Sequence, residues 1–547
     1  MNTAELLVKC LENEGVEYVF GIPGEENLAV IDAINHSEKI RFITTRHEQG
    51  AAFMADVYGR LTGKSGVCLA TLGPGATNLM TGVADAEGDG APLVAITGQV
   101  PTDRMHITSH QFLDLTKMFE PVTRRTKLVV RPDTIHEIVR LAFKYAESER
   151  PGATHIDLPV DISKMEVPPG TKPLLREVPQ REFADVISEE FAAAEIFKAE
   201  NPVILAGSAA VRAHASEALT QFAETLKIPV VNTMMAKGIL SCASKYAMMT
   251  VGIPQKDYAD KLLEKADLVI AVGYDLVEYA PSKWNADMQK RILHIGTRPA
   301  HINKCYQCCV QVVGDISDSL FGILRRTSRT REPLDALRIK ERFLEEQNAY
   351  AEDTAFPLKP QKILSDVRRV MGEDDILISD VGAHKMWIGR LYGCYRPNTC
   401  LISNGFAAMG IAVPGAVAAK LVYPERRVLA VTGDGGFMMN MQELETAVRI
   451  GVRFVVLLFH DDSYGLIKWK QLDQYGYSEC VDFSNPDFVK LAEAMHCKGY
   501  RVSAAEDLLP TLEAAFADDV PAVVDCPVDY RENVKLSEAL HELYGNL

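Results

Sequence analysis

Short apolar runs alternate with helical patterns along the chain. In the first third the runs cover 16–22, 40–45, 66–72, 92–97 and 153–159, and each is followed by Gly, Pro or a polar turn and then by a helical pattern. The middle third has runs at 201–211, 228–233, 267–273, 291–296 and 310–316, and the last third at 375–382, 427–432, 454–459 and 522–529. This alternation predicts buried parallel strands joined by helices. The N-terminal segment fits as well, because its apolar positions predict an amphipathic helix that leads into the first strand.

Two interruptions divide this pattern. Residues 167–182 are rich in Pro and charge and lack periodicity, and residues 328–360 are charged and helical before turning polar. Both predict linkers. We therefore expect an α/β protein of three doubly wound parallel-sheet domains, at 1–165, 185–327 and 360–535, of which the middle one is Rossmann-like. The outer two have a similar size and rhythm, although no residue-level repeat is visible.

Composition and charge narrow the class of protein. The 547 residues are too many for one core, and 47% hydrophobic with 24% charged residues is typical of a soluble globular protein. A net charge of −16 argues against nucleic acid or an anionic membrane as the main partner. The N-terminus lacks the pattern of a signal peptide, and no apolar stretch is long enough to span a membrane. An odd number of cysteines, 11, favours free thiols in a reducing compartment, so we expect a cytoplasmic protein.

Acidic residues follow two neighbouring strands of the third block. The strand 427–432 ends in Gly433-Asp434-Gly435-Gly436, and the strand 454–459 is followed by Asp461. Adjacent parallel strands would bring Asp434 and Asp461 side by side, and the carbonyl of Ser463 could add a third oxygen ligand for magnesium. Taken alone, such residues are more often turn residues and helix caps. The second strand-end Asp makes a metal site the favoured interpretation.

Glu48 stands in a comparable position in the first block. It follows the strand 40–45 and enters a helix rich in small residues. From position alone, the simpler interpretation is an acid in the first turn of a helix, stabilised by the helix dipole.

Together these motifs resemble those of thiamine-diphosphate enzymes. The Gly-Asp-Gly with its later paired acids, the Arg46-His-Glu48 segment, and the segments 20–24 and 72–78 all match. The resemblance runs from about residue 3 to 535 and is closest to acetolactate synthases of the catabolic, FAD-independent type, on segments 272–285, 439–448 and 527–533. It implies thiamine diphosphate and Mg²⁺ as cofactors, without FAD. It also implies a pyrimidine-binding first domain, a diphosphate-binding third domain, and a homodimer that could pair into a tetramer.

The resemblance also implies residue roles. Glu48 matches the glutamate that activates the cofactor, Met409 the apolar wedge that holds it bent, and Gln111 a glutamine on the substrate side. Asp461 and Asp462 stand where paired Asn is usual, and Ser463 where Gly is usual; Asp434, Asp461 and Ser463 remain the expected metal ligands. The expected cofactor-binding residues are Pro23, Gly24, Gly73, Gly382, Ala383, His384, Met409, Gly433, Gly435, Gly436, Tyr464 and Gly465.

The implied reaction is decarboxylation of pyruvate and addition of the hydroxyethyl carbanion to a second pyruvate, giving 2-acetolactate and CO₂. The segments 468–470 and 25–27 depart from the family pattern, so a 2-keto acid decarboxylase, or a carboligase with another acceptor, is the alternative. An NAD-dependent dehydrogenase is a weaker rival, because Gly207 lacks the full glycine fingerprint around it. A degenerate homologue without activity would be expected to have lost Glu48 or Asp434, and both are present.

Overall fold

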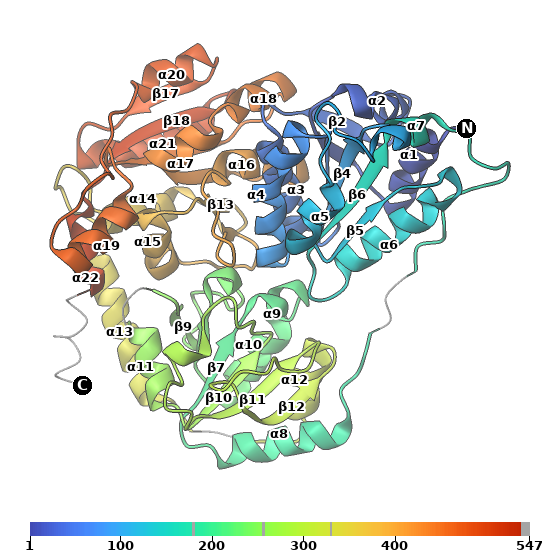
Figure 1. The fold of residues 1–547 in the computed structure, drawn as a ribbon. Helices are drawn as coiled ribbons and strands as arrows, with labels where there is room; N and C mark the ends of the chain where they lie inside the picture. Colours follow the sequence, from blue (N-terminus) through green and yellow to red (C-terminus); the bar gives the residue numbers. More distant parts are fainter. Residues whose placement is uncertain (178–180, 254–256, 329–330, 538–547) are drawn as a thin grey trace.

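The computed structural model describes residues 1–177, 181–253, 257–328 and 331–537 (Figure 1). Residues 178–180 and 329–330, which belong to the two predicted linkers, lie outside the described part. Three sheets of six strands each are present, and every strand pair within them is parallel. The predicted α/β class with three parallel-sheet domains is confirmed.

The N-terminal sheet has the strand order β2-β1-β3-β4-β6-β5. Helices α3 and α4 cover one face, while α1 and α6 cover the other, so apolar side chains are buried on both sides. The strands are β1 Tyr18–Gly21, β2 Arg41–Thr44, β3 Gly66–Ala70, β4 Leu93–Gln99, β5 Arg125–Leu128 and β6 Ala153–Pro159. The helices are α1 Thr3–Glu14, α2 Leu28–Asn35, α3 Glu48–Thr62, α4 Pro74–Asp89, α5 Leu115–Phe119, α6 Ile135–Glu147 and α7 Val160–Lys164.

The C-terminal sheet has the order β14-β13-β15-β16-β18-β17. When the strands of each domain are counted along the chain, this is the same order as in the N-terminal sheet. The strands are β13 Ile376–Ser379, β14 Cys400–Ile402, β15 Val428–Gly433, β16 Val455–His460, β17 Lys498–Arg501 and β18 Ala522–Pro527. The helices are α14 Pro360–Val370, α15 Ala383–Leu391, α16 Ala412–Val422, α17 Asp434–Asn440, α18 Glu443–Ile450, α19 Gly465–Tyr475, α20 Phe488–Ala494, α21 Leu508–Ala517 and α22 Val534–Ser537.

The central sheet has the order β12-β11-β10-β7-β8-β9, which is the Rossmann arrangement. Its strands are β7 Pro202–Ala206, β8 Val230–Asn232, β9 Ala247–Thr250, β10 Leu268–Val272, β11 Arg291–Gly296 and β12 Cys308–Val313. Its helices are α8 Val186–Lys198, α9 Ser208–Arg212, α10 Ser216–Leu226, α11 Tyr258–Lys265 and α12 Ile316–Leu324, and the connecting helix α13 spans Leu334–Asn348.

The two outer domains are joined by one shared core. Helix α3 of the N-terminal domain packs against α4 of its own domain and against α16 of the C-terminal domain, as Figure 1 shows at the meeting of the blue and gold helices. The cluster includes Ala51, Ala55 and Val57 on α3 and Ala412, Ala416 and Ala419 on α16. Small side chains on both helices let the axes approach closely, so the two domains are held as neighbours.

Four strands were absent from the sequence prediction: β5, β9, β14 and β17. Each lies at the edge of its sheet. The residues of β5 and β17, Arg-Thr-Lys-Leu and Lys-Gly-Tyr-Arg, are mostly polar and largely accessible to solvent. An edge strand needs no continuous apolar run, so the hydrophobic pattern does not reveal it.

Across the described ranges, no helix is both long and apolar enough to cross a membrane. All of the cysteines are unpaired thiols.

Candidate active site

The carboxyl ends of β15 and β16 bring three acids together. These strands are parallel neighbours, with Gly433 opposite Phe459, so the residues that follow them lie at the same edge of the sheet. Oδ2 of Asp434 accepts hydrogen bonds from the backbone N–H of Asp461 at 3.3 Å and of Asp462 at 2.7 Å. The Ser463 hydroxyl donates to Oδ2 of Asp461 at 2.7 Å. The three residues predicted as metal ligands therefore form one group.

Because this group is buried, its ionised carboxylates carry a desolvation cost. Burial raises the pKa of Asp461 to about 7, with a further contribution from the charge of Asp434, and burial also raises the pKa of Asp434. A divalent cation would favour the ionised form of both carboxylates and offset this cost. An oxygen-rich set with two carboxylates is the set that Mg²⁺ takes together with phosphate oxygens. The residues present fit a magnesium ion.

We call Asp434, Asp461 and Ser463 the metal clamp. His460 and Asp462 lie beside it, and the atoms of Asp434, His460 and Asp462 that could bind a metal lie within 4.8 Å of one another. His460 is already engaged: Nδ1 lies 2.7 Å from Asp525 and Nε2 lies 3.0 Å from Asp462. The hydrogen bond to Asp525, with that to Asp462, raises the pKa of His460 to about 9. A protonated imidazole has no lone pair for a metal. His460 instead balances the charge of Asp462, the acid that the family motif commonly lacks.

A cavity of about 180 Å³ opens beside these acids. Its lining contains Val381, Ala407, Leu466, Ile467 and Tyr530 together with all twelve of the C-terminal residues expected at the site: Gly382, Ala383, His384, Met409, Gly433, Asp434, Gly435, Gly436, Asp461, Ser463, Tyr464 and Gly465.

Two polar atoms of this lining lack partners. Nε2 of His384 and the hydroxyl of Tyr530 are buried without a hydrogen-bond partner among the residues described. Burial lowers the pKa of His384 to about 4, so the ring is neutral and one nitrogen can donate. Buried polar atoms without partners are rare, and a phosphate oxygen would satisfy them. The lining therefore fits a diphosphate group.

Glycine is required at two positions because neighbouring side chains lie too close for a Cβ. A Cβ at Gly465 would lie 2.6 Å from Oδ2 of Asp461, and a Cβ at Gly435 would lie 2.7 Å from the ring of Tyr464. Any larger residue would displace a clamp carboxylate or the aromatic ring beside it. This explains why glycine stands at these two places of the motif.

The segment that carries Met409 is held by carboxylates on both sides. Oδ1 of Asp85, on α4, accepts from the Ser403 hydroxyl at 2.7 Å and from the backbone N–H of Ala408 at 3.1 Å. Oδ1 of Asp380 accepts from the N–H of Gly410 at 2.8 Å. Ala407 adopts a φ of 60°, which is unusual for alanine. These bonds hold a strained backbone in place, and with it Met409.

The N-terminal candidates gather at the carboxyl edge of their own sheet. Glu48 is the first residue of α3, is 9% exposed, and accepts a hydrogen bond from Nδ2 of Asn78 at 2.9 Å. A Cβ at Gly75 would lie 3.4 Å from Oε1 of Glu48. The carboxylate thus lies beside the glycine-rich start of α4.

The other N-terminal candidates surround the same turn. Gly73 adopts a φ of 56°, and a Cβ there would meet Gln111 at 2.9 Å. Gln111 itself has a φ of 57°, rare for a residue with a side chain. Gly24, which follows Pro23, lies against Thr71, since a Cβ would meet that side chain at 2.4 Å. Within the described residues, none of Pro23, Gly24, Glu48, Gly73 and Gln111 lines the cavity of the C-terminal domain.

The sequence did not predict one carboxylate that lies next to the residues before Glu48. Glu443, on α18, accepts at Oε1 from the backbone N–H of Arg46 and of His47, each at 3.0 Å. It therefore holds the residues just before Glu48 from the other domain. Burial raises the pKa of Glu443 to about 7. Its only signal in the sequence was its place in the 439–448 segment that resembles the family.

Comparison with known proteins accounts for this arrangement. Three families of thiamine pyrophosphate enzyme domains match: the N-terminal TPP binding domain over residues 1–120, the central domain over 190–323 and the C-terminal TPP binding domain over 380–526. The chain is 36% identical to acetolactate synthase of Bacillus subtilis, over 100% of this chain and 96% of that one. It is 37% identical to the catabolic acetolactate synthase of Raoultella terrigena, over 98% and 97%. It is 34% identical to a probable acetolactate synthase large subunit of Methanococcus aeolicus, over 97% and 92%.

This chain belongs to the acetolactate synthase family. The resemblance seen in the sequence is confirmed, and with it a thiamine-diphosphate-dependent enzyme of the acetolactate synthase type. The Rossmann order of the central sheet therefore belongs to the central domain of a thiamine-diphosphate enzyme, and the rival interpretation as a dehydrogenase has no support.

Proposed function

We propose that this protein converts two molecules of pyruvate into 2-acetolactate and CO₂, with thiamine diphosphate and Mg²⁺ as cofactors. The observation that carries the proposal is the C-terminal cavity, where two strand-end carboxylates, glycine backbone and the unpartnered nitrogen of His384 surround one space. When bound, thiamine diphosphate supplies the carbanion chemistry by which a 2-keto acid loses CO₂ and attacks a second carbonyl group.

The residues of the chain divide the remaining work. Asp434, Asp461 and the carbonyl of Ser463 hold the metal, and His384 donates to the diphosphate. Met409 supports the cofactor from its clamped segment. Glu48 would donate a hydrogen bond from its carboxyl group to the pyrimidine ring of the cofactor. The Gln111 amide binds a keto or carboxylate oxygen of the substrate.

We propose that the working unit is a homodimer in which Glu48 of one subunit faces the C-terminal cavity of the other. Two observations support this. The N-terminal and C-terminal candidates form separate groups within one chain, and large exposed apolar side chains lie on and around the C-terminal cavity. These are Phe406, Met438, Met439, Tyr464 and Ile467. An exposed apolar surface of this kind favours coverage by a second copy.

Mixed dimers test this arrangement. At a Mg²⁺ concentration just sufficient for the wild type, chains carrying Glu48→Gln and chains carrying Asp434→Asn are each expected to have little activity. After subunit exchange at equal amounts, half of the dimers are mixed and each has one intact site, so about one quarter of the wild-type activity should return. If the sites were built within single chains, no activity would return on mixing.

We further propose that the enzyme works without FAD. The buried carboxylate of Glu278 accepts at Oε1 from the backbone N–H of Ser208 at 3.0 Å and from its hydroxyl at 2.8 Å, and at Oε2 from the hydroxyl of Thr233. These groups lie at the carboxyl ends of β7 and β8, where a Rossmann sheet receives the phosphates of a dinucleotide. A carboxylate at that place accepts the hydrogen bonds that a phosphate would need, and its negative charge repels phosphate. The purified protein is expected to be colourless, and added FAD should leave its activity unchanged.

We propose a cytoplasmic location as well. The unpaired thiols along the chain fit a reducing compartment.

Incubation with pyruvate tests the reaction directly. The holoenzyme is expected to form acetolactate, and acetolactate and acetaldehyde should be assayed separately. Acetaldehyde without acetolactate would replace the synthase with a 2-keto acid decarboxylase. Formation of neither product, with no thermal stabilisation by thiamine diphosphate and Mg²⁺, would indicate a degenerate homologue.

A further inference from the structure

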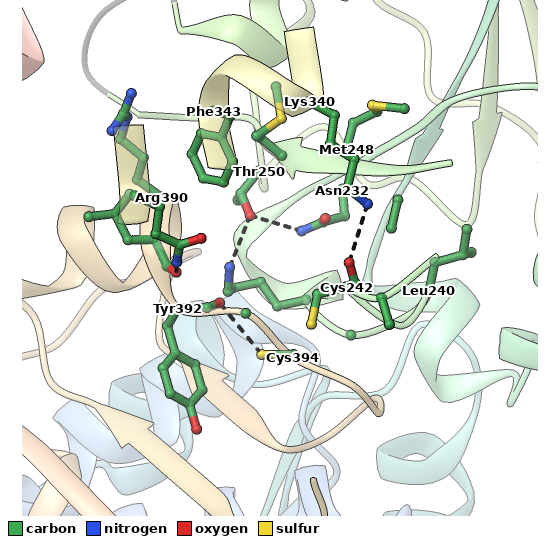
Figure 2. Close-up of a pocket in the computed structure, with 18 of the residues that line it drawn as sticks. Asn232, Leu240, Cys242, Met248, Thr250, Lys340, Phe343, Arg390, Tyr392 and Cys394 are labelled. Atoms are coloured by element: carbon green, nitrogen blue, oxygen red, sulfur yellow. Dashed lines mark hydrogen bonds between the residues drawn. The ribbon is translucent and has the colours of Figure 1, made fainter. Parts of the chain in front are cut away.

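A second cavity lies between the central and C-terminal domains (Figure 2). Its volume is about 260 Å³, and it shares no lining residue with the cavity of the candidate active site. The walls come from the strand β9, the loop after β8, the connecting helix α13, and the helices α14 and α15 with the segment that follows α15. A ligand here would contact both domains and the helix that connects them.

The charged side chains of this lining are all basic. It contains Lys237, Lys340, Arg368 and Arg390 and no Asp or Glu. Arg390 is neutralised, because it pairs with Asp257 at 2.7 Å and with Glu346 at 2.8 Å. Within the described part of the chain, the other three cations form no ion pair. This is unusual in a protein whose net charge is −16.

The three unpaired cations are bonded only to neutral oxygens. Nζ of Lys237 donates to the carbonyl of Gly389 at 2.9 Å and to the hydroxyl of Thr250 at 3.2 Å. Nζ of Lys340 donates to the carbonyl of Cys242 at 3.2 Å. Nη1 of Arg368 donates to carbonyl and hydroxyl oxygens after α15. Lys237 is only 8% exposed. A buried cation without a counter-ion carries a desolvation cost that an anion would offset.

Besides Asn232, Thr250 and Gln347, the lining has apolar and aromatic side chains. Figure 2 shows Phe343 and Met248 near Lys340, with Leu240 and Tyr392 lower along the same cavity. The guanidinium group of Arg368 lies over the ring of Tyr392 at 4.8 Å. A simple inorganic anion would use the cations and leave these walls in contact with water. The lining therefore fits a molecule that has an acidic head and an apolar body.

We propose that this cavity binds a small organic anion, with a carboxylate or phosphate head held by Lys237 and Lys340 and an apolar body packed against Phe343 and Met248. The site is independent of the catalytic proposal. Burial lowers the pKa of Lys340, and a bound anion would favour its charged form. Because the lysines belong to the central domain and to α13, while Gly389 belongs to the C-terminal domain, the ligand tightens the junction of the three.

The test uses the holoenzyme with saturating thiamine diphosphate and Mg²⁺, so that the diphosphate site is filled. Calorimetry with hexanoate, hexyl phosphate and hexanol separates the two head groups from the body that they share. We expect at least one of the two anions to bind and the alcohol to bind at least about tenfold more weakly. The tighter of the two anions identifies the head group.

Two variants locate the binding. Lys237→Met and Lys340→Gln are each expected to weaken anion binding by about tenfold, the effect of one lost charge-assisted hydrogen bond. Lys9→Gln, at an exposed lysine on α1, is the matched control and should bind as the wild type does. If Lys237→Met does not fold, the binding measured for Lys340→Gln, on helix α13, decides whether the proposal holds. Equal binding in Lys340→Gln and wild type, equal binding of hexanol and the anions, or no binding up to about 10 mM would overturn the proposal.

Discussion

The N-terminal and C-terminal domains share one strand order, yet the carboxyl edges of their sheets carry different chemistry. The N-terminal edge presents Glu48 beside glycine-rich backbone and the amide of Asn78. The C-terminal edge gathers Asp434, Asp461 and Asp462 beside an open cavity. The common topology fixes where a ligand can approach, and the residues just after each strand decide what it meets.

The comparison extends to how the two edges are held. Asp85 of the N-terminal domain accepts a backbone N–H from the C-terminal loop that carries Met409. Glu443 of the C-terminal domain accepts backbone N–H groups just before Glu48. Each domain therefore uses a buried carboxylate to fix the loop of the other. The predictions below test whether the two edges depend on each other in this way.

The largest effect is expected at the N-terminal edge. Glu48→Gln should lower acetolactate formation by about 10²–10⁴-fold, because an amide cannot exchange the proton that a general acid supplies. Stabilisation by thiamine diphosphate and Mg²⁺ in a thermal melt should persist, since the diphosphate site is elsewhere in the chain. Glu38→Gln, at an exposed glutamate of the same domain, serves as the control. Turnover near the wild-type rate in Glu48→Gln would contradict the assigned role.

The corresponding change at the C-terminal edge should act on the metal. Asp434→Asn removes a carboxylate from the clamp, so the Mg²⁺ concentration needed for half-maximal activity should rise by at least about tenfold, with partial recovery at high Mg²⁺. Asp482→Asn removes an exposed acid that pairs with Lys468 and should have little effect. Loss of activity in Asp434→Asn with an unchanged Mg²⁺ requirement would argue against the clamp.

A smaller effect is expected where the N-terminal domain holds the Met409 segment. Asp85→Ala should lower kcat by about tenfold, because the loop loses two hydrogen bonds and Met409 is less well fixed. Asp56→Ala is a matched control: Asp56 pairs with the same Arg60 as Asp85 but bonds no residue of the loop. Both variants should melt at lower temperature. Equal loss of kcat in the two would mean that only stability is affected.

The smallest effect concerns pH. The pKa of Glu443 is raised from 4.5 to about 7 in the folded protein, so its protonated form is favoured there. The stability that this supplies is full below about pH 4.5 and is lost as pH rises through about 7, a change of up to about 3 kcal/mol. Glu443→Gln should therefore flatten the fall of Tm between about pH 5 and pH 8. Glu445→Gln, at a half-exposed glutamate on the same helix that pairs with Arg449, should keep the wild-type slope.

Hydrophobic patterning predicted the interior strands well. Every predicted strand of the outer domains that lies inside its sheet was found, because burial on both faces demands a continuous apolar run. The four missed strands lie at sheet edges, where one side has no neighbouring strand. Nothing in a local pattern distinguishes the Lys498–Arg501 strand from a polar loop.

In the candidate site, too, some residues could be predicted from the sequence and others could not. The acids and glycines after β15 and β16 were local signals at strand ends, while Met409, Gly382, Ala383 and His384 were implied by the family resemblance; all twelve candidates line the C-terminal cavity. Asp85, Asp380 and Glu443 were not predicted. Their partners lie elsewhere in the sequence. Asp85 and Glu443 lie inside helices, where an acid resembles any solvated acid until the fold buries it, and the position of Asp380 after β13 does not reveal that it bonds the Met409 segment.

By itself the sequence determined the three parallel α/β domains, the cofactor class and the residues after each strand, because apolar period, glycine and charge act over short distances along the chain. The tertiary structure alone decided which of those residues meet. It placed all twelve C-terminal candidates in one cavity and kept Glu48 in a separate group. Between two domains it also left three cations that have no counter-ion among the described residues. Such contacts depend on how helices such as α3 and α16 pack, and packing joins residues that no local pattern relates.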